Sequence, residues 1–281
     1  MSHRLAGAAC IGLPCRFGDQ AGRCKRLESA LPQVRIAALL FVLLLSVPVD
    51  GSRGDTKTVI ALSRDAFGAA LLDYLEGEQV PDLVLEVQGG QPGPAMHPEW
   101  FFRDFERWEW WDRELLPLIE RGPVLDLGAG AGRASLYLQE RGLRVAAVDA
   151  SPGAVEVCRR RGVADVRLGD VNAPPADLPW AGVLLLCGNL GLGGSWQGSR
   201  RLLARLAELV TPGAVLVGDS VTPDGAPEVA LRIRYRNLVT AWWRQYNIPA
   251  AQMAALVDGT GWKIDRHLED GEDHAVLLRR T

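Results

Sequence analysis

Residues 124–133 have the sequence VLDLGAGAGR, and this stretch decides how the chain folds. Its first four residues predict a short buried strand, and a helix is expected to begin near Arg133 and to continue through Gln139. Between them lie three glycines at alternate positions, which let the backbone turn tightly and approach a ligand closely. Because the first N–H groups of the helix point at that turn, the stretch predicts a ligand-binding site.

Two carboxylates follow at the ends of the next two predicted strands. Asp149 ends the second strand, where a carboxylate can accept hydrogen bonds from both hydroxyls of a ribose. Asp170 follows Gly169 at the end of the third strand, where an acid can bind an adenine amino group. We therefore expect a nucleoside at this edge of the sheet.

Strands alternate with helices throughout residues 121–281, which predicts an α/β domain with a mostly parallel sheet and right-handed crossovers. The further strands are expected at residues 144–148, 163–168, 182–187 and 214–218, and the helices at 152–161 and 200–210. The tail departs from this alternation. It predicts a half-exposed strand at 229–236, a helix at 249–258, and an antiparallel hairpin of 262–268 with 274–278.

Residues 58–120 are predicted to form a small helical cap. Residues 63–76 have the apolar spacing of an amphipathic helix, residues 80–87 could form a short strand, and residues 98–120 are helical and rich in aromatics. We expect the segment from Trp100 to Trp111 to close over the site and to supply part of an acceptor pocket. Ordinary core packing remains the alternative for these aromatics, as it does for Trp242 and Trp243.

Residues 1–57 differ in composition from the rest of the chain and are interpreted as a leader, disordered or non-native. Their apolar run at 36–49 is short for a membrane-spanning helix and its basic flank is long for a signal peptide. A cleaved signal, an anchor or a later translation start remain alternatives. No stable membrane insertion is expected.

Charge and cysteine content exclude several classes of partner. The 281 residues carry a formal net charge of −3, so no nucleic-acid partner is expected. Five cysteines without any CxxC pair argue against a zinc site or a disulfide framework, so no metal is expected. A reduced, cytoplasmic compartment fits this cysteine usage.

The motifs together resemble the class I S-adenosylmethionine-dependent methyltransferase superfamily over about residues 100–281. The similarity lies in VLDLGAGAGR at 124–133, VAAVDASPGAVEVCRRRGV at 145–163, RLGDVNAP at 167–174 and LLLCGNLGLGG at 184–194. The resemblance implies a Rossmann-like methyltransferase fold and S-adenosyl-L-methionine as the cofactor. It implies that the methionine part contacts Asp126, Gly128, Ala129 and Gly130, the ribose Asp149 and Ala150, the adenine Asp170 and Val171, and that Cys187 and Asn189 line the reaction face.

The sequence leaves the methyl acceptor and the oligomeric state open. Residues 188–191 lack the Asn/Asp-Pro-Pro-aromatic motif of amino-N methyltransferases. Cys187 lacks the preceding proline of cytosine-C5 methyltransferases, so we interpret Cys187 as a core thiol. Asn189 and His97 are weak candidates for a catalytic role. A short cap favours a small-molecule acceptor over protein or RNA. An NAD(P)-dependent oxidoreductase and a non-catalytic S-adenosylmethionine-binding protein remain alternatives.

Overall fold

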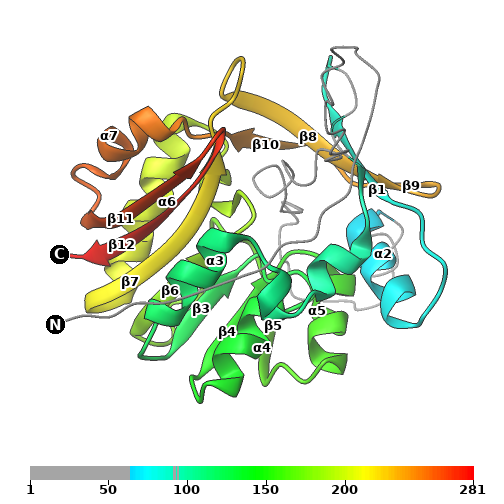
Figure 1. Cartoon of the computed structure of the whole chain (residues 1–281), viewed down its shortest axis with the longest axis horizontal. Helices are drawn as coiled ribbons and strands as arrows, with labels where there is room; N and C mark the ends of the chain where they lie inside the picture. The colour runs from blue at the N-terminus through cyan, green and yellow to red at the C-terminus, as the bar shows by residue number, and fades with distance from the viewer. Residues whose placement is uncertain (1–63, 91–92, 94) are drawn as a thin grey trace, which may run out of the picture. The chain divides into compact units, whose positions relative to one another are not determined.

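The computed structural model describes residues 64–90, 93 and 95–281, and within them a seven-stranded sheet carries the Gly-rich turn (Figure 1). The strand order is β11-β12-β7-β6-β3-β4-β5. Neighbouring strands are parallel from β7 to β5, whereas β12 is antiparallel to both β7 and β11. The strands are β3 (Val124–Leu127), β4 (Val145–Asp149), β5 (Asp165–Leu168), β6 (Trp180–Leu185), β7 (Val210–Val221), β11 (Trp262–Asp270) and β12 (Asp273–Arg280). This confirms the predicted Rossmann-like fold with its closing antiparallel hairpin.

The helices between these strands bury the faces of the sheet. They are α4 (Arg133–Glu140), α5 (Pro152–Arg160), α6 (Trp196–Leu209) and α7 (Met253–Val257). Helices α4 and α5 contact β4, while α6 and α7 contact β11. Every residue of β3 and β4 is buried, as expected for parallel strands covered on both sides.

Residues 58–120 contribute the strand expected within 80–87, and a second short strand that was not expected, to a second sheet. Its members are β1 (Leu83–Val87), β2 (Ala95–Met96), β8 (Glu228–Tyr235), β9 (Leu238–Val239) and β10 (Trp243–Tyr246). Strand β1 pairs antiparallel with β8, with Leu85 opposite Ile233. The N–H and C=O groups of β1 need partners, and these come from a strand far along the chain.

The helical part of the cap is shorter than predicted. It consists of α2 (Ala66–Leu75), α3 (Trp110–Leu115) and the single turns η1 (Pro98–Phe102), η2 (Phe105–Arg107) and η3 (Leu116–Leu118). Arg103 and Trp108 have extended backbone, with ψ of 145° and 171°, and these two residues interrupt the expected helix.

Helix α2 is attached to the start of α5. The buried carboxylate of Asp65 accepts hydrogen bonds from the N–H groups of Gly68 and Gly153, each at 2.8 Å, and from the hydroxyl of Ser151 at 2.7 Å. A Cβ on Gly153 would lie 2.6 Å from the backbone of Gly68, so only glycine permits this contact. The N-terminal segment is thereby held at the carboxyl edge of the parallel strands.

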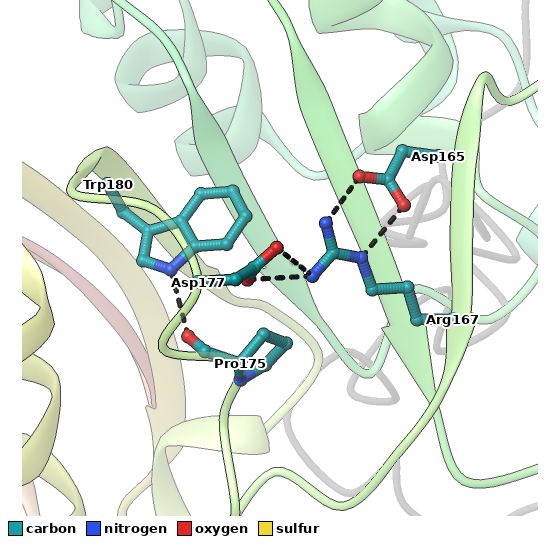
Figure 2. A network of polar contacts seen from close by, with 5 residues as sticks. All are labelled: Asp165, Arg167, Pro175, Asp177 and Trp180. Atoms are coloured by element: carbon teal, nitrogen blue, oxygen red, sulfur yellow. Dashed lines mark hydrogen bonds and ion pairs between the residues drawn. The ribbon is translucent and has the colours of Figure 1, made fainter.

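An arginine anchors the outer strand β5 to the connection that leads into β6 (Figure 2). The guanidinium of Arg167 donates to Asp165 at 2.7 and 2.8 Å and to Asp177 at 2.9 and 3.0 Å. Beside it, the indole N–H of Trp180 donates to the carbonyl of Pro175 at 3.0 Å. These contacts fix the connection that follows Asp170.

Across residues 64–90 and 95–281, the structure contains no helix with the length and apolarity needed to cross a membrane. The apolar run at 36–49 and the proposed leader at 1–57 lie outside the described residues.

Candidate functional site

The Gly-rich turn forms at the carboxyl end of β3. Gly128, Gly130 and Gly132 have φ values of 80°, 57° and 75°, a region that only glycine enters without strain. A Cβ on Gly132 would lie 2.9 Å from the Cys158 sulfur, so close packing demands glycine there as well. The turn is tied to the next strand, because the N–H of Gly128 donates to the Val148 carbonyl at 2.8 Å.

Asp149 and Asp126 stand on either side of this turn, and both are buried. Asp149 accepts from the N–H groups of Gly130 and Ser151, each at 2.8 Å, while Asp126 accepts from the Ser135 hydroxyl at 2.6 Å. Burial raises the pKa of Asp149 to about 7 and that of Asp126 to about 6. A carboxylate has about four lone-pair sites, so Asp149 retains acceptor capacity for further hydroxyl donors.

Cys187 and Asn189 lie at the carboxyl end of β6, opposite the turn. Asn189 is fully buried, and its amide N–H₂ donates to the carbonyls of Leu127 at 2.9 Å and Gly128 at 3.3 Å. Asn189 therefore holds the Gly-rich turn against β6. Cys187 has a positive φ of 61°, and its N–H donates to buried Asp219 at 2.8 Å.

The Cys187 thiol remains protonated, as expected for a core thiol. Burial raises its pKa well above the ordinary value, and a thiol that stays neutral is a poor nucleophile. Asp219, on β7, is buried and accepts a second N–H, that of Gly188, so this carboxylate fixes the strained turn after β6. The sequence prediction missed Asp219, which looks like any polar residue near the end of a strand.

A buried ion pair that the sequence analysis also missed completes the edge. Arg133, on α4, donates to Asp112, on α3, at 3.3 Å, and their side chains are only 7% and 2% exposed. The guanidinium lies 4.1 Å from the ring centroid of Trp100 and 4.9 Å from that of Trp108. Burial raises the pKa of Asp112, and Arg133 opposes that shift. No periodicity marks Asp112, which lies within an aromatic-rich stretch.

Several polar atoms at this edge have no partner among the described residues. They are Nη1 of Arg133, Oδ1 of Asp112 and Oδ1 of Asn189. A buried donor or acceptor without a partner costs about 1–3 kcal/mol, so the edge is incomplete by itself. Nη1 of Arg133 can donate to a carboxylate, and Oδ1 of Asp112 can accept from an ammonium group. The pair therefore suits the two charged groups of an amino acid.

A small cavity of about 20 Å³ opens over the Gly-rich turn. Its walls include the turn itself, Arg133, Cys187 and the ring of Phe101 from the N-terminal segment. Ligand pockets for whole cofactors measure about 300–1,000 Å³. This cavity therefore covers only the part of the edge next to the Gly-rich turn, and neither Asp149 nor Asp170 lines it.

The remaining predicted site residues fall into two groups. Ala150, Asp170 and Val171 lie at the ends of β4 and β5, as expected, and Asp170 accepts from the Asn172 N–H at 2.8 Å. His97 is exposed and does not line this cavity. Its Nδ1 accepts from the Glu99 N–H at 3.2 Å as the N-cap of η1, so the structure does not bring it to the site.

Residues 124–213 match the family model described as "Methyltransferase domain". The malonyl-[acyl-carrier protein] O-methyltransferase of Salmonella typhimurium is 34% identical over 113 residues, which is 38% of this chain and 41% of that protein. The demethylmenaquinone methyltransferase of Clavibacter sepedonicus is 46% identical over 57 residues, which is 20% of this chain and 23% of that protein. The chain thus spans less than half the length of these curated relatives.

The fold has a counterpart among solved structures. An S-adenosylmethionine-dependent methyltransferase from Bacteroides fragilis, solved with S-adenosyl-L-homocysteine, matches with a TM-score of 0.70 and 23% identity, over 78% of this chain and 96% of that one. At this identity the likeness supports the fold, while the Gly-rich turn and the family model support the class. Residues 124–213 therefore match a methyltransferase domain, and the seven-stranded sheet shares the fold of this S-adenosylmethionine-dependent methyltransferase.

Proposed function

We propose that this protein is an S-adenosylmethionine-dependent methyltransferase that acts on a small molecule. The observation that carries the proposal is the Gly-rich turn of β3, joined to Asp149 by the hydrogen bond from the Gly130 N–H. A turn of this kind beside a carboxylate on the next strand suits a nucleoside whose ribose hydroxyls need acceptors. When bound, S-adenosylmethionine supplies a methyl group activated by a positive sulfonium.

We propose distinct duties for the residues at this edge. Arg133 and Asp112, through their unpaired atoms, bind the carboxylate and the ammonium of the methionine part. Asp149 with Ala150 accepts the ribose hydroxyls, and Asp170 with Val171 faces the adenine. Asp126, Gly128, Ala129 and Gly130 form the floor.

The chain's part in the reaction is alignment and exclusion of water rather than proton transfer. Asn189 holds the turn in place, and the neutral Cys187 thiol, whose sulfur accepts from the Arg133 guanidinium at 3.6 Å, forms part of the wall. Burying the reacting groups removes competing water and keeps them in line. No residue needs to act as a strong base if the acceptor is already nucleophilic.

A small-molecule acceptor is supported by the short segment that covers the site, where Trp100 and Phe101 are both buried. The two curated relatives are named for a malonyl group on an acyl carrier protein and for demethylmenaquinone, so their acceptors differ from each other. Neither nucleic acid nor a membrane is part of the proposal.

We also propose a cytoplasmic location for the protein. The two described cysteines, Cys158 and Cys187, are free and buried, which suits a reducing compartment. Fractionation of the source cells tests this, and recovery in the membrane or outside the cell would contradict it.

Titration calorimetry with S-adenosyl-L-homocysteine and with NAD tests the activity proposal. We expect binding of the first and none of the second. Asp149→Ala removes an acceptor of two charge-assisted bonds of about 1.5–3 kcal/mol each, so affinity should fall by roughly 10²–10⁴-fold. Asp82→Ala, which removes an equal charge from an exposed site, is the control.

Two outcomes would contradict the proposal. Binding of NAD alone would assign the chain to an oxidoreductase. Tight binding of S-adenosyl-L-homocysteine without methyl transfer to any metabolite in an extract, followed with labelled cofactor, would leave a non-catalytic binding protein.

A further inference from the structure

A second cavity lies beside the connection between β6 and α6, and none of the proposed cofactor residues lines it. Its volume is about 620 Å³, within the range of about 300–1,000 Å³ typical of small-molecule sites. Residues 192–195 and the first turns of α6 form one wall, and Arg244 of β10 belongs to another. Asn172, after β5, completes the rim.

Three arginines give this cavity its chemistry. Arg201 and Arg205 are one helical turn apart on α6, and Arg244 comes from the second sheet. Among the described residues that line the cavity, none is acidic. Like charges at this helical spacing destabilise a helix by about 0.2–0.5 kcal/mol, and an anion between them would remove the repulsion.

Two of the three guanidinium groups are available to a ligand. The guanidinium groups of Arg201 and Arg244 make no hydrogen bond or ion pair with any residue that the structure describes. Arg205 contacts Glu208 at 2.7 Å, but both side chains are about half exposed or more. Exposed pairs of this kind contribute about 0–1 kcal/mol, so a bound anion can take Arg205 from Glu208.

Two of the glycines that line the cavity pack backbone to backbone. A Cβ on Gly193 would lie 2.1 Å from the Gly198 carbonyl carbon, and one on Gly198 would lie 1.8 Å from the Gly193 oxygen. The connection between β6 and α6 therefore packs closely against the first turn of α6. On the other side, the Asn172 side-chain N–H₂ donates to the Leu192 carbonyl at 3.3 Å.

We propose that this cavity binds a small molecule through its phosphate or carboxylate group, held by Arg201, Arg205 and Arg244. Guanidinium groups bind both kinds of oxyanion by paired N–H donors. A cavity with only three arginines, in a chain of net charge −3, favours a small anion over a nucleic acid. The proposal goes beyond methyl transfer and does not depend on it.

The site is physically connected to the proposed cofactor site. The segment that begins at Cys187 beside the Gly-rich turn ends at Ser195 in this cavity. Strand β10 spans the same segment, since the Gln245 side chain donates to the Gly188 carbonyl at 2.9 Å while the neighbouring Arg244 lines the cavity. An anion bound here would therefore restrain the loop that faces the methyl-transfer centre.

Calorimetric titration with inorganic phosphate and, separately, with succinate at low ionic strength tests the proposal. We expect at least one of the two anions to bind at one site per chain, and the Arg201→Gln/Arg244→Gln variant to bind it at least roughly tenfold more weakly. The matched control is Arg159→Gln/Arg266→Gln, which removes two exposed arginines outside this cavity. Its affinity should equal that of the unmodified protein.

The outcomes separate cleanly. Binding of phosphate alone or succinate alone identifies the class of ligand, and binding of both identifies a general oxyanion site. Binding of neither, equal binding by the cavity variant, or an equal loss in the control would overturn the proposal. Affinity for S-adenosyl-L-homocysteine, measured on the same samples, should stay within about twofold. If the unmodified protein does not bind S-adenosyl-L-homocysteine, the methyl-transfer proposal is refuted, but the anion-site proposal is not affected.

Discussion

Replacing Arg133 by methionine removes one half of the buried ion pair with Asp112 and leaves the other half in place. The Asp112 side chain is only 2% exposed, and its other oxygen already lacks a partner. A buried charge left without its counter-ion costs about 3–5 kcal/mol. The substitution also removes the contact of the guanidinium with Trp100, which destabilises the folded protein by about 2 kcal/mol when the contact is desolvated. It removes the unpaired Nη1 as well, which stabilises the folded protein by about 1–3 kcal/mol.

Because these last two effects roughly cancel, the ion-pair term decides the result. We expect Arg133→Met to lower the free energy of unfolding by about 3–5 kcal/mol, measured by urea denaturation near pH 7. This corresponds to a fall in melting temperature of roughly 6–20 °C for a domain of this size. Loss of the counter-charge raises the pKa of Asp112 above its value of about 6, so the deficit should shrink as the pH falls from 7 to 6, where the carboxyl of the variant takes up a proton.

A second variant tests the reasoning directly. Arg133→Met/Asp112→Leu replaces the pair by apolar side chains, which is often neutral for stability, so most of the loss should be recovered. Both variants should nevertheless bind S-adenosyl-L-homocysteine more weakly, since the proposed contacts are gone. Arg113→Met, at an exposed position on α3, is the control. A double variant no more stable than the single one would refute the argument.

Four further predictions follow from other contacts. Phe101→Ala should lower the free energy of unfolding by about 3–5 kcal/mol, because the ring is 4% exposed; normal stability with lost turnover would instead show a pocket role. Ser199→Ala should leave the melting temperature unchanged or raise it, because the buried hydroxyl has no hydrogen-bond partner among the described residues. A clear fall in melting temperature would show that the hydroxyl does make a hydrogen bond. Burial raises the pKa of Asp149 to about 7, so between about pH 4 and pH 7 the folded protein holds a proton that the unfolded chain has released. The free energy of unfolding should therefore rise as the pH falls from about 7 to about 4. Asp149→Asn should flatten that rise in urea denaturation measured across this pH range. Gly153→Ala should detach α2 from α5, seen as faster amide exchange in residues 66–75, whereas unchanged exchange would show that the helices can adjust.

Local pattern was sufficient to predict most elements of the main sheet. The strands at 124–127 and 145–149 are buried on both faces, so their apolar runs and the turns that follow them are visible in the sequence. The closing hairpin around Asp270 and Gly271 was equally clear. Helix α6 and strand β7 both begin earlier than predicted, because their first residues carry no periodicity of their own.

The second sheet could not be predicted in the same way. Residues 80–87 and 229–236 were each recognisable as strands, but nothing in either segment names the other as its partner. Strand β10 was not predicted, because the sequence around Trp242 and Trp243 is equally compatible with a loop. Pairing between distant strands is decided by the packing of the whole chain.

The Gly-rich turn and the carboxylates at the strand ends could be predicted from local sequence, because a tight turn of this kind depends on backbone conformations that few residues allow. The buried pair of Arg133 and Asp112, the contact of Asn189 with the turn and the capping of η1 by His97 are visible only in the folded chain. The first two contacts join elements distant in the sequence. Their burial and their unpaired atoms, from which the proposed chemistry is argued, exist only once the chain has folded.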